Sequence, residues 1–177
     1  MKKLSLFISF VFSLSICTAQ TTAVTQTLNL SLTNIISLTF VSSGTSTGGT
    51  ITLPFSSTSD YDNGVISSDQ QLTVLSNMHF NVAVQSNAVN FSYSGTVTPA
   101  PTIQVANVLQ MMVSANNTGG SLSYSSYASI PSGTATIINW GSPGGNQTFS
   151  VRYKATPGYT MPSGTYTTNI IYTATQL

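Results

Sequence analysis

His79 is the only histidine of the chain, and Asp60, Asp62 and Asp69 are its only acidic side chains. A histidine can act as a general base, but it needs a nucleophile and an orienting carboxylate beside it. No Asp is close to His79 in sequence, and the alternation that begins at Phe80 predicts that the imidazole faces solvent. The favoured interpretation is an exposed surface histidine, and a hydrolase with an unrecognised site is only the third hypothesis.

The run Asp60-Tyr61-Asp62-Asn63-Gly64 partly matches a calcium loop, in which oxygen ligands alternate along a tight turn. Gly64 stands at the third ligand position, however, and Gln71 stands where such a loop has its bidentate Glu. Because Asn and Gly tolerate positive φ, we predict a hairpin turn here and keep weak calcium binding as the alternative. The sequence contains no Cys/His metal cluster, phosphate loop or dinucleotide fingerprint, so no cofactor is expected.

Aromatic side chains are the other candidates for ligand contact. Flat rings can stack on a sugar, but they are also ordinary core and edge residues of a β-sandwich. The possible ligand surface consists of Trp140, Tyr124, Tyr127 and Tyr159. Packing in the core or at an interface is the favoured interpretation, and carbohydrate binding is the alternative.

The first nineteen residues are typical of a secretory leader. Lys2 and Lys3 precede the apolar run 4–16, which is too short to span a bilayer, and small residues follow it. We predict a signal peptide, residues 1–19, that is cleaved after Ala19. A lipoprotein acylated at Cys17 is the alternative, but a bulky Ile directly precedes this cysteine.

Removal of residues 1–19 would leave Arg152 and Lys154 against three Asp, which gives a net charge of −1. Such a surface has no basic field to collect phosphate groups, so nucleic-acid binding is disfavoured. No polybasic patch favours anionic lipid, and no membrane span is expected in the mature chain. Residues 20–177 contain no cysteine and are long enough for one two-layer core, so we predict a single domain held by burial.

The polar residues are mostly Ser, Thr and Asn, and the chain contains no Glu. Thr, Val, Ile, Tyr and Phe suit a pleated, half-buried surface, whereas helices in water usually draw on Glu, Lys, Ala and Leu. Apolar and polar residues alternate in short runs, and turns separate these runs at the spacing of a sandwich. We therefore predict an all-β fold, an immunoglobulin-like antiparallel β-sandwich of about ten strands.

The clearest alternation lies near the C-terminus, in residues 149–155 and again in 166–174. The Pro- and Gly-containing loop 157–164 joins the two runs, so we predict an antiparallel hairpin with one core face. The densest apolar run, residues 103–115, has an ambiguous period. A central strand with a bulge is favoured there over a helix.

Residues 24–32 alternate as well, with Leu28, Leu30 and Leu32 separated by polar residues. We expect a strand here, and the favoured interpretation is the first strand of the chain's own sandwich. The alternative is that strand 24–32 pairs with the exposed edge of another copy or of another surface protein. This segment is therefore the candidate for partner binding.

Two short motifs resemble secreted bacterial surface proteins. One is the closing Gly-Thr-Tyr strand, which runs from Ser163 to Thr175, and the other is Leu72-Thr73-Val74 followed by Ser76-Asn77 and Phe80-Asn81-Val82. The similar families are spore-coat-U-like and WxL-like domains and, more loosely, pilin subunits. Phe80 stands where the WxL signature has Trp, and the disulfide common in pilins and coat-U proteins is absent.

The resemblance implies a non-enzymatic sandwich at the cell surface with a structural or adhesive use. We accordingly expect a secreted protein, extracellular, periplasmic or on the cell surface, that self-associates or is a subunit of a surface assembly. A carbohydrate-binding module that uses Trp140 and exposed tyrosines is the alternative function.

Overall fold

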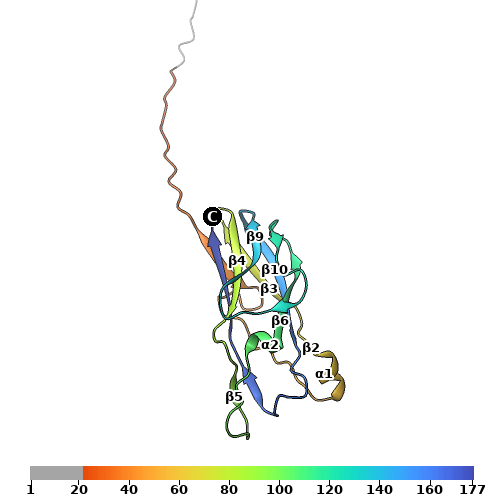
Figure 1. The fold of residues 1–177 in the computed structure, drawn as a ribbon. Helices are drawn as coiled ribbons and strands as arrows, with labels where there is room; N and C mark the ends of the chain where they lie inside the picture. The colour runs from red at the N-terminus through yellow and green to blue at the C-terminus, as the bar shows by residue number, and fades with distance from the viewer. Residues whose placement is uncertain (1–21) are drawn as a thin grey trace, which may run out of the picture. The chain divides into compact units, whose positions relative to one another are not determined.

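The computed structural model describes residues 22–177, so the predicted leader, its cleavage site and Cys17 lie outside the described residues. The chain divides into two units, residues 1–32 and 33–177. In the first unit, the described residues 22–32 contain no helix or strand, and all of them are exposed. The regular structure lies in the second unit (Figure 1).

Within residues 22–177, twelve strands form two larger sheets and one small sheet. The first sheet has the order β1-β3-β10-β6-β8, with β2 beside β10, and consists of β1 (Ile36–Phe40), β2 (Val65–Ile66), β3 (Gln70–Ser76), β6 (Leu109–Asn116), β8 (Ala128–Ser129) and β10 (Gly144–Ala155). The second sheet has the order β12-β4-β9-β7 and consists of β4 (Phe80–Ser86), β7 (Ser121–Leu122), β9 (Ala135–Gly141) and β12 (Ile170–Gln176). The small sheet pairs β5 (Ser92–Ser94) with β11 (Thr165–Thr167).

Every strand pairing is antiparallel, and alternate side chains of both larger sheets meet in one core. In β4 every second residue is buried, which is the two-residue period of a strand with one core face. The largest fully buried side chains are Phe80, Phe149, Leu72, Met111, Ile130, Ile137 and Ile138. The predicted all-β antiparallel sandwich is confirmed, with twelve strands instead of about ten.

Two short helices form where the sequence predicted a turn and part of a strand. α1 (Thr58–Asn63) lies where a hairpin turn was expected, because Ser57 and Asp60 form a capping box that starts a helix. α2 (Val105–Val108) forms the first part of the dense apolar run, and the strand expected there begins only at Leu109. Figure 1 shows both helices toward the end of the sandwich that lies away from the C-terminus.

The predicted C-terminal hairpin is wrong, although both of its strands form. β10 belongs to the first sheet and β12 to the second, so the two runs face each other across the core instead of pairing. β11 lies between them in sequence and pairs with β5. The alternating pattern fixed which side chains are buried, but it did not fix which strand is the neighbour.

The strand predicted at residues 24–32 is not formed. No strand of the chain pairs with this segment within the described residues, and its large apolar side chains are exposed: Val24, Leu28, Leu30 and Leu32. A strand needs a partner for its backbone groups, which alternation alone does not supply. Within residues 22–177 the chain also has no helix that is long and apolar enough to cross a membrane.

Candidate functional site

Each larger sheet has two edge strands within residues 33–177: β1 and β8 in the first sheet, and β12 and β7 in the second. β7 and β8 have only two residues each, whereas β1 has five and β12 has seven. β1 ends the strand order of the first sheet, and β12 ends that of the second. Both strands line one groove, so the two edges lie side by side on the same side of the sandwich (Figure 1). We call this side the open edge. It is the strongest candidate site, because an uncovered edge offers unpaired backbone groups to another strand.

In β12 the even-numbered residues present their backbone to the open edge. Hydrogen bonds flank the β12–β4 ladder, from Asn87 N to Asn169 O and from Leu177 N to His79 O, each 2.9 Å long. Because hydrogen-bonded and non-hydrogen-bonded pairs alternate in an antiparallel ladder, the odd-numbered residues of β12 bond to β4. The residues whose N–H and C=O groups point to the open edge are Ile170, Tyr172, Ala174 and, at the end of the strand, Gln176.

The free part of β1 is shorter. Its ladder with β3 alternates in the same way and also turns the even-numbered residues to the open edge. Both backbone groups of Phe40 are bonded within the turn that follows β1. The Phe40 N–H donates to Thr45 O, and the Phe40 C=O accepts from Gly44 N, each at 2.8 Å. The backbone groups that remain free on β1 are those of Ile36 and Leu38.

The groove between β1 and β12 has a volume of about 380 Å³. Inward side chains of both edge strands form its walls, and fully buried Leu72 of β3 contributes to its floor. The wall residues that pack against the core are Leu38, Phe40, Ile170, Tyr172 and Ala174. The lining residues 36–40, Ser46, Leu72 and 170–174 include no charged side chain. The groove therefore suits an uncharged segment with apolar side chains.

Side-chain contacts connect the two walls. The ring of Phe40 meets Tyr172 edge to face, with centroids 6.2 Å apart, and Gln176 Nε2 donates to Ile35 O at 2.7 Å. The Tyr172 hydroxyl lies 2.7 Å from the hydroxyl of Tyr153 on β10. Burial raises the pKa of both phenols, that of Tyr153 to about 12. The pair is therefore neutral and hydrogen-bonded at neutral pH, which holds β12 against the first sheet.

Each edge strand is anchored at its start by a Ser-Asn turn. Ser76 ends β3 and Ser86 ends β4, and each buried hydroxyl donates to the carbonyl two residues later at 2.7 Å. Asn77 bonds the backbone just before β1, through hydrogen bonds of 3.0 and 2.9 Å. Asn87 accepts a hydrogen bond of 2.9 Å from the backbone just before β12. The two Ser-Asn turns thus fix the walls of the groove.

Trp140, the first residue of the predicted ligand surface, lies at a bulge of β9 and is 61% exposed. Its φ of 58° lies in the left-handed region that side-chain-bearing residues seldom adopt. Its ring stacks on His79, with centroids 4.8 Å apart and planes inclined by 22°. His79 Nδ1 is 3.1 Å from Gly141 O, so the imidazole is a half-buried packing partner instead of a free surface side chain.

The predicted tyrosines lie in other surroundings. Tyr159 stacks on Tyr61 with centroids 5.4 Å apart, and its hydroxyl donates to Asp62 Oδ1 at 2.7 Å. This hydrogen bond to a carboxylate raises the pKa of Tyr159. Tyr124 and Tyr127 are half-buried in the segment between β7 and β8. No ring contact within residues 22–177 joins the tryptophan to these tyrosines, so the ligand surface of these four residues stays a prediction.

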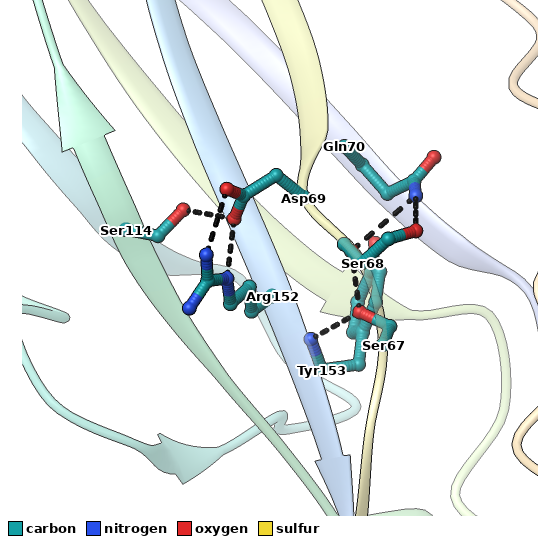
Figure 2. A network of polar contacts seen from close by, with 7 residues as sticks. All are labelled: Ser67, Ser68, Asp69, Gln70, Ser114, Arg152 and Tyr153. Atoms are coloured by element: carbon teal, nitrogen blue, oxygen red, sulfur yellow. Dashed lines mark hydrogen bonds and ion pairs between the residues drawn. The ribbon is translucent and has the colours of Figure 1, made fainter.

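Each carboxylate has a structural partner. Asp60 caps α1. Its carboxylate accepts hydrogen bonds from the backbone N–H groups of Ser56 and Ser57, which lower the pKa of Asp60. Asp62 accepts the tyrosine hydrogen bond described above. Asp69 forms a bidentate ion pair with Arg152, at 2.6 and 2.9 Å, and accepts a hydrogen bond from Ser114, which together lower the pKa of Asp69 (Figure 2). Within the described part of the chain, no three side chains of the metal-binding types gather around one point.

The chain matches no protein-family model and no curated protein. The resemblance to spore-coat-U-like and WxL-like domains therefore stays a prediction. Sequence reasoning missed the groove, because its walls come from residues 36–40 and 170–174, at opposite ends of the sandwich sequence. The alternation of both runs was visible, but their position as adjacent edges depends on strand order.

Proposed function

We propose that the chain is a non-enzymatic, secreted structural or adhesion protein that self-associates or joins a surface assembly through its open edge. One observation carries the proposal: two uncovered edge strands flank an apolar groove without charged residues. Sheet proteins that act alone usually protect such edges with short strands, inward charges or a covering segment. An edge without these devices is suited to pairing with a strand from another molecule.

The surroundings of the reactive side chains support the non-enzymatic part of the proposal. The three carboxylates cap a helix, accept a tyrosine hydrogen bond and form an ion pair, and the histidine stacks on Trp140. The leader-like pattern of residues 1–19 supports secretion. The neutral surface left after removal of the leader suits contact with proteins more than contact with phosphate-rich polymers.

Light scattering coupled to size exclusion, together with negative-stain microscopy, tests this function on the protein as its host processes it. We expect the average mass to rise with protein concentration and elongated assemblies to form on the grid. A monodisperse monomer at the highest attainable concentration would overturn self-association. Intact mass measurement on the same sample checks the leader, and we expect the chain to begin at Gln20.

A second candidate function is carbohydrate binding at Trp140. The observation that favours it is an exposed indole held in a left-handed backbone conformation and supported from one side by His79. Such strained positions are frequent at ligand sites, and an exposed ring can stack on a sugar face. Trp140 is the only tryptophan, so its fluorescence reports this site alone. A flat glycan array and an unchanged emission spectrum would eliminate this candidate.

A further inference from the structure

We propose that residues 24–32 of a second copy of the chain occupy the groove at the open edge and add a strand beside β12. This inference rests on the proposed function and deepens it, because it names the partner of the open edge. The donor segment of one molecule and the groove of the next are different surfaces of the same chain.

The donor segment has the side chains that such a strand needs. Its large apolar residues are among the most exposed of the described chain: Val24 91%, Leu28 84%, Leu30 79% and Leu32 80%. They occupy even-numbered positions, so they share one face of a strand, with Thr, Asn or Ser between them in residues 27–32. Residues 22–32 carry no charge, and neither does the lining of the groove. Insertion of residues 26–32 would therefore bury three apolar side chains, Leu28, Leu30 and Leu32, without burying an ion.

Spacing and length match as well. β12 has seven residues, and the seven residues 26–32 span about 23 Å as a strand, at about 3.3 Å per residue. The backbone groups offered by Ile170, Tyr172 and Ala174 recur every second residue, as do those on one side of any strand. Leu28, Leu30 and Leu32 would point into the groove with the inward side chains of β12. The segment would thus satisfy backbone groups and fill the groove together.

The hydrogen bonds that hold the chain leading into β1 favour a donor from another molecule. Asn77 donates to Thr33 O at 2.9 Å and accepts from Ile35 N at 3.0 Å, and Asn77 N donates to Ile35 O at 3.3 Å. Residues 33–35 contain no turn. If strand 26–32 were to lie beside β12 of its own chain, the chain would need a reversal directly before these bonded residues. The same bonds stay intact when the segment enters a neighbour's groove.

Such a contact is heterologous, since it joins a donor segment to a groove elsewhere on the next copy. Heterologous contacts that do not close into a ring produce open chains. Each molecule in the chain would have its groove filled and its segment inserted, except at the two ends. The expected assembly is therefore a linear fibre with one contact type.

A matched pair of substitutions in the donor segment tests the inference in the full chain. Leu30→Asp puts a charge on the apolar face, and Asn29→Asp puts the same charge one residue earlier on the polar face. Both lie outside the compact unit 33–177, so circular dichroism and the melting temperature of the sandwich should not change. We expect Leu30→Asp to weaken association by about ten- to hundredfold and Asn29→Asp to assemble like the natural chain.

A substitution in the groove completes the test. Ala174→Pro removes an N–H group that points to the open edge and leaves the β12–β4 ladder its bonds. If the Ala174→Pro variant does not fold, Leu38→Lys takes its place. This substitution puts a charge on the opposite wall of the groove. Each groove variant keeps its donor segment, and Leu30→Asp keeps its groove. We expect each variant alone to be monomeric, and a mixture of a groove variant with Leu30→Asp to form a one-to-one dimer that grows no further.

The outcomes separate this inference from the proposed function. If the natural chain assembles and all variants assemble equally, another surface is used, and the inference fails while self-association stands. If the natural chain is a monomer and Leu30→Asp lowers its melting temperature, the segment fills its own groove, and the inference also fails. If the natural chain is a monomer that no substitution affects, both proposals fail. A capped one-to-one dimer in the mixture supports both.

Discussion

The two sides of the sandwich end in different ways. On the covered side, residues 121–130 run from β7 in the second sheet to β8 in the first, and both of these strands have only two residues. Ser123 N donates to Ile137 O on β9 at 3.1 Å, and Val113 N on β6 donates to Tyr124 O at 2.8 Å. This segment therefore bonds to both sheets. At the open edge no comparable segment is present within residues 33–177.

The covered side shows what a single crossing segment achieves. It brings Ile130 into the core with 0% exposure, whereas Ile36 on β1 stays 37% exposed at the open edge. A stretch of about ten residues is thus enough to cover both sheets of this sandwich. Residues 24–32 have a similar length and the alternation of a strand, but they form no strand themselves. The open edge is consequently a property of how this chain is arranged and not a requirement of the fold.

The largest effect is expected for Ile130→Ala on the covered side. The side chain is fully buried, so its truncation should lower the free energy of unfolding by about 2–5 kcal/mol. Leu38→Ala at the open edge removes a half-buried side chain and should cost only about 1 kcal/mol. Chemical denaturation followed by circular dichroism, at a concentration where the chain is monomeric, measures both values.

Ile171→Ala is the control for this pair, because Ile171 is 40% exposed on the outer face of β12 and should tolerate truncation. Equal losses for Ile130→Ala and Leu38→Ala would mean that the two sides are equally well packed, which would break the comparison. At concentrations that favour assembly, the cost of Leu38→Ala should increase, because an inserted strand would complete its burial.

Sequence reasoning was sufficient for properties that depend on local alternation. The apolar positions of residues 149–155 and 170–174 predicted their inward faces, and Phe149 and Tyr172 do pack against the core. Composition was sufficient for the all-β class, because Thr, Val, Ile and Tyr fill both faces of the strands. These features depend on each strand separately, so neighbours along the chain carry the information.

Strand order depends on contacts between distant residues, which the alternation does not encode. Residues 149–155 and 166–174 have the same pattern whether they pair with each other or face each other across the core. Residues 24–32 have the pattern of a strand but are not assigned to a strand. The capping box at Ser57 and Asp60 was readable as Ser-x-x-Asp, yet the Asn-Gly dipeptide favoured a turn. The strands that form the candidate site could therefore be predicted from the sequence, but their adjacent positions could not.

An intermediate loss of stability is expected at high pH, because of the buried hydroxyl of Tyr153 that bonds to Tyr172 of β12. The pKa of Tyr153 is about 12 in the folded chain, above its usual value of 10.0, because burial disfavours the phenolate. Above pH 10 the unfolded chain loses this proton and the folded chain keeps it, so stability falls as pH rises toward 12. The contribution is complete below pH 10, and about 2–3 kcal/mol should be lost by pH 12.

Denaturation at a series of pH values, with Tyr153→Phe as the test variant, measures this loss. Phe cannot ionise, so the variant should start less stable, because it loses the Tyr172 hydrogen bond, but should decline less steeply between pH 10 and 12. Tyr61→Phe is the matched control, since the Tyr61 hydroxyl makes no hydrogen bond within residues 22–177. A parallel decline in Tyr153→Phe and the natural chain would show that this hydroxyl pair does not set the alkaline limit.

Effects smaller than those at Ile130 and Tyr153 are expected at the two Ser-Asn turns, each of which holds one wall of the groove. Asn77→Ala removes side-chain bonds to the backbone before β1, and Asn87→Ala removes those before β12. Each substitution should lower the free energy of unfolding by about 1–2 kcal/mol, the cost of one or two hydrogen bonds. Hydrogen exchange followed by mass spectrometry should show faster exchange in β1 for Asn77→Ala and in β12 for Asn87→Ala.

Asn139→Ala is the matched variant on the covered side, where Asn139 Nδ2 donates only to Ser123 Oγ at 3.1 Å. Backbone bonds already hold that segment, so exchange in β7 and β8 should change little. Asn77→Ala has a further consequence, because it frees residues 33–35 to turn. The donor segment could then enter its own groove, and assembly should decrease more in Asn77→Ala than in Asn87→Ala. Equal assembly of these two variants would show that Asn77 does not decide between the chain's own groove and its neighbour's.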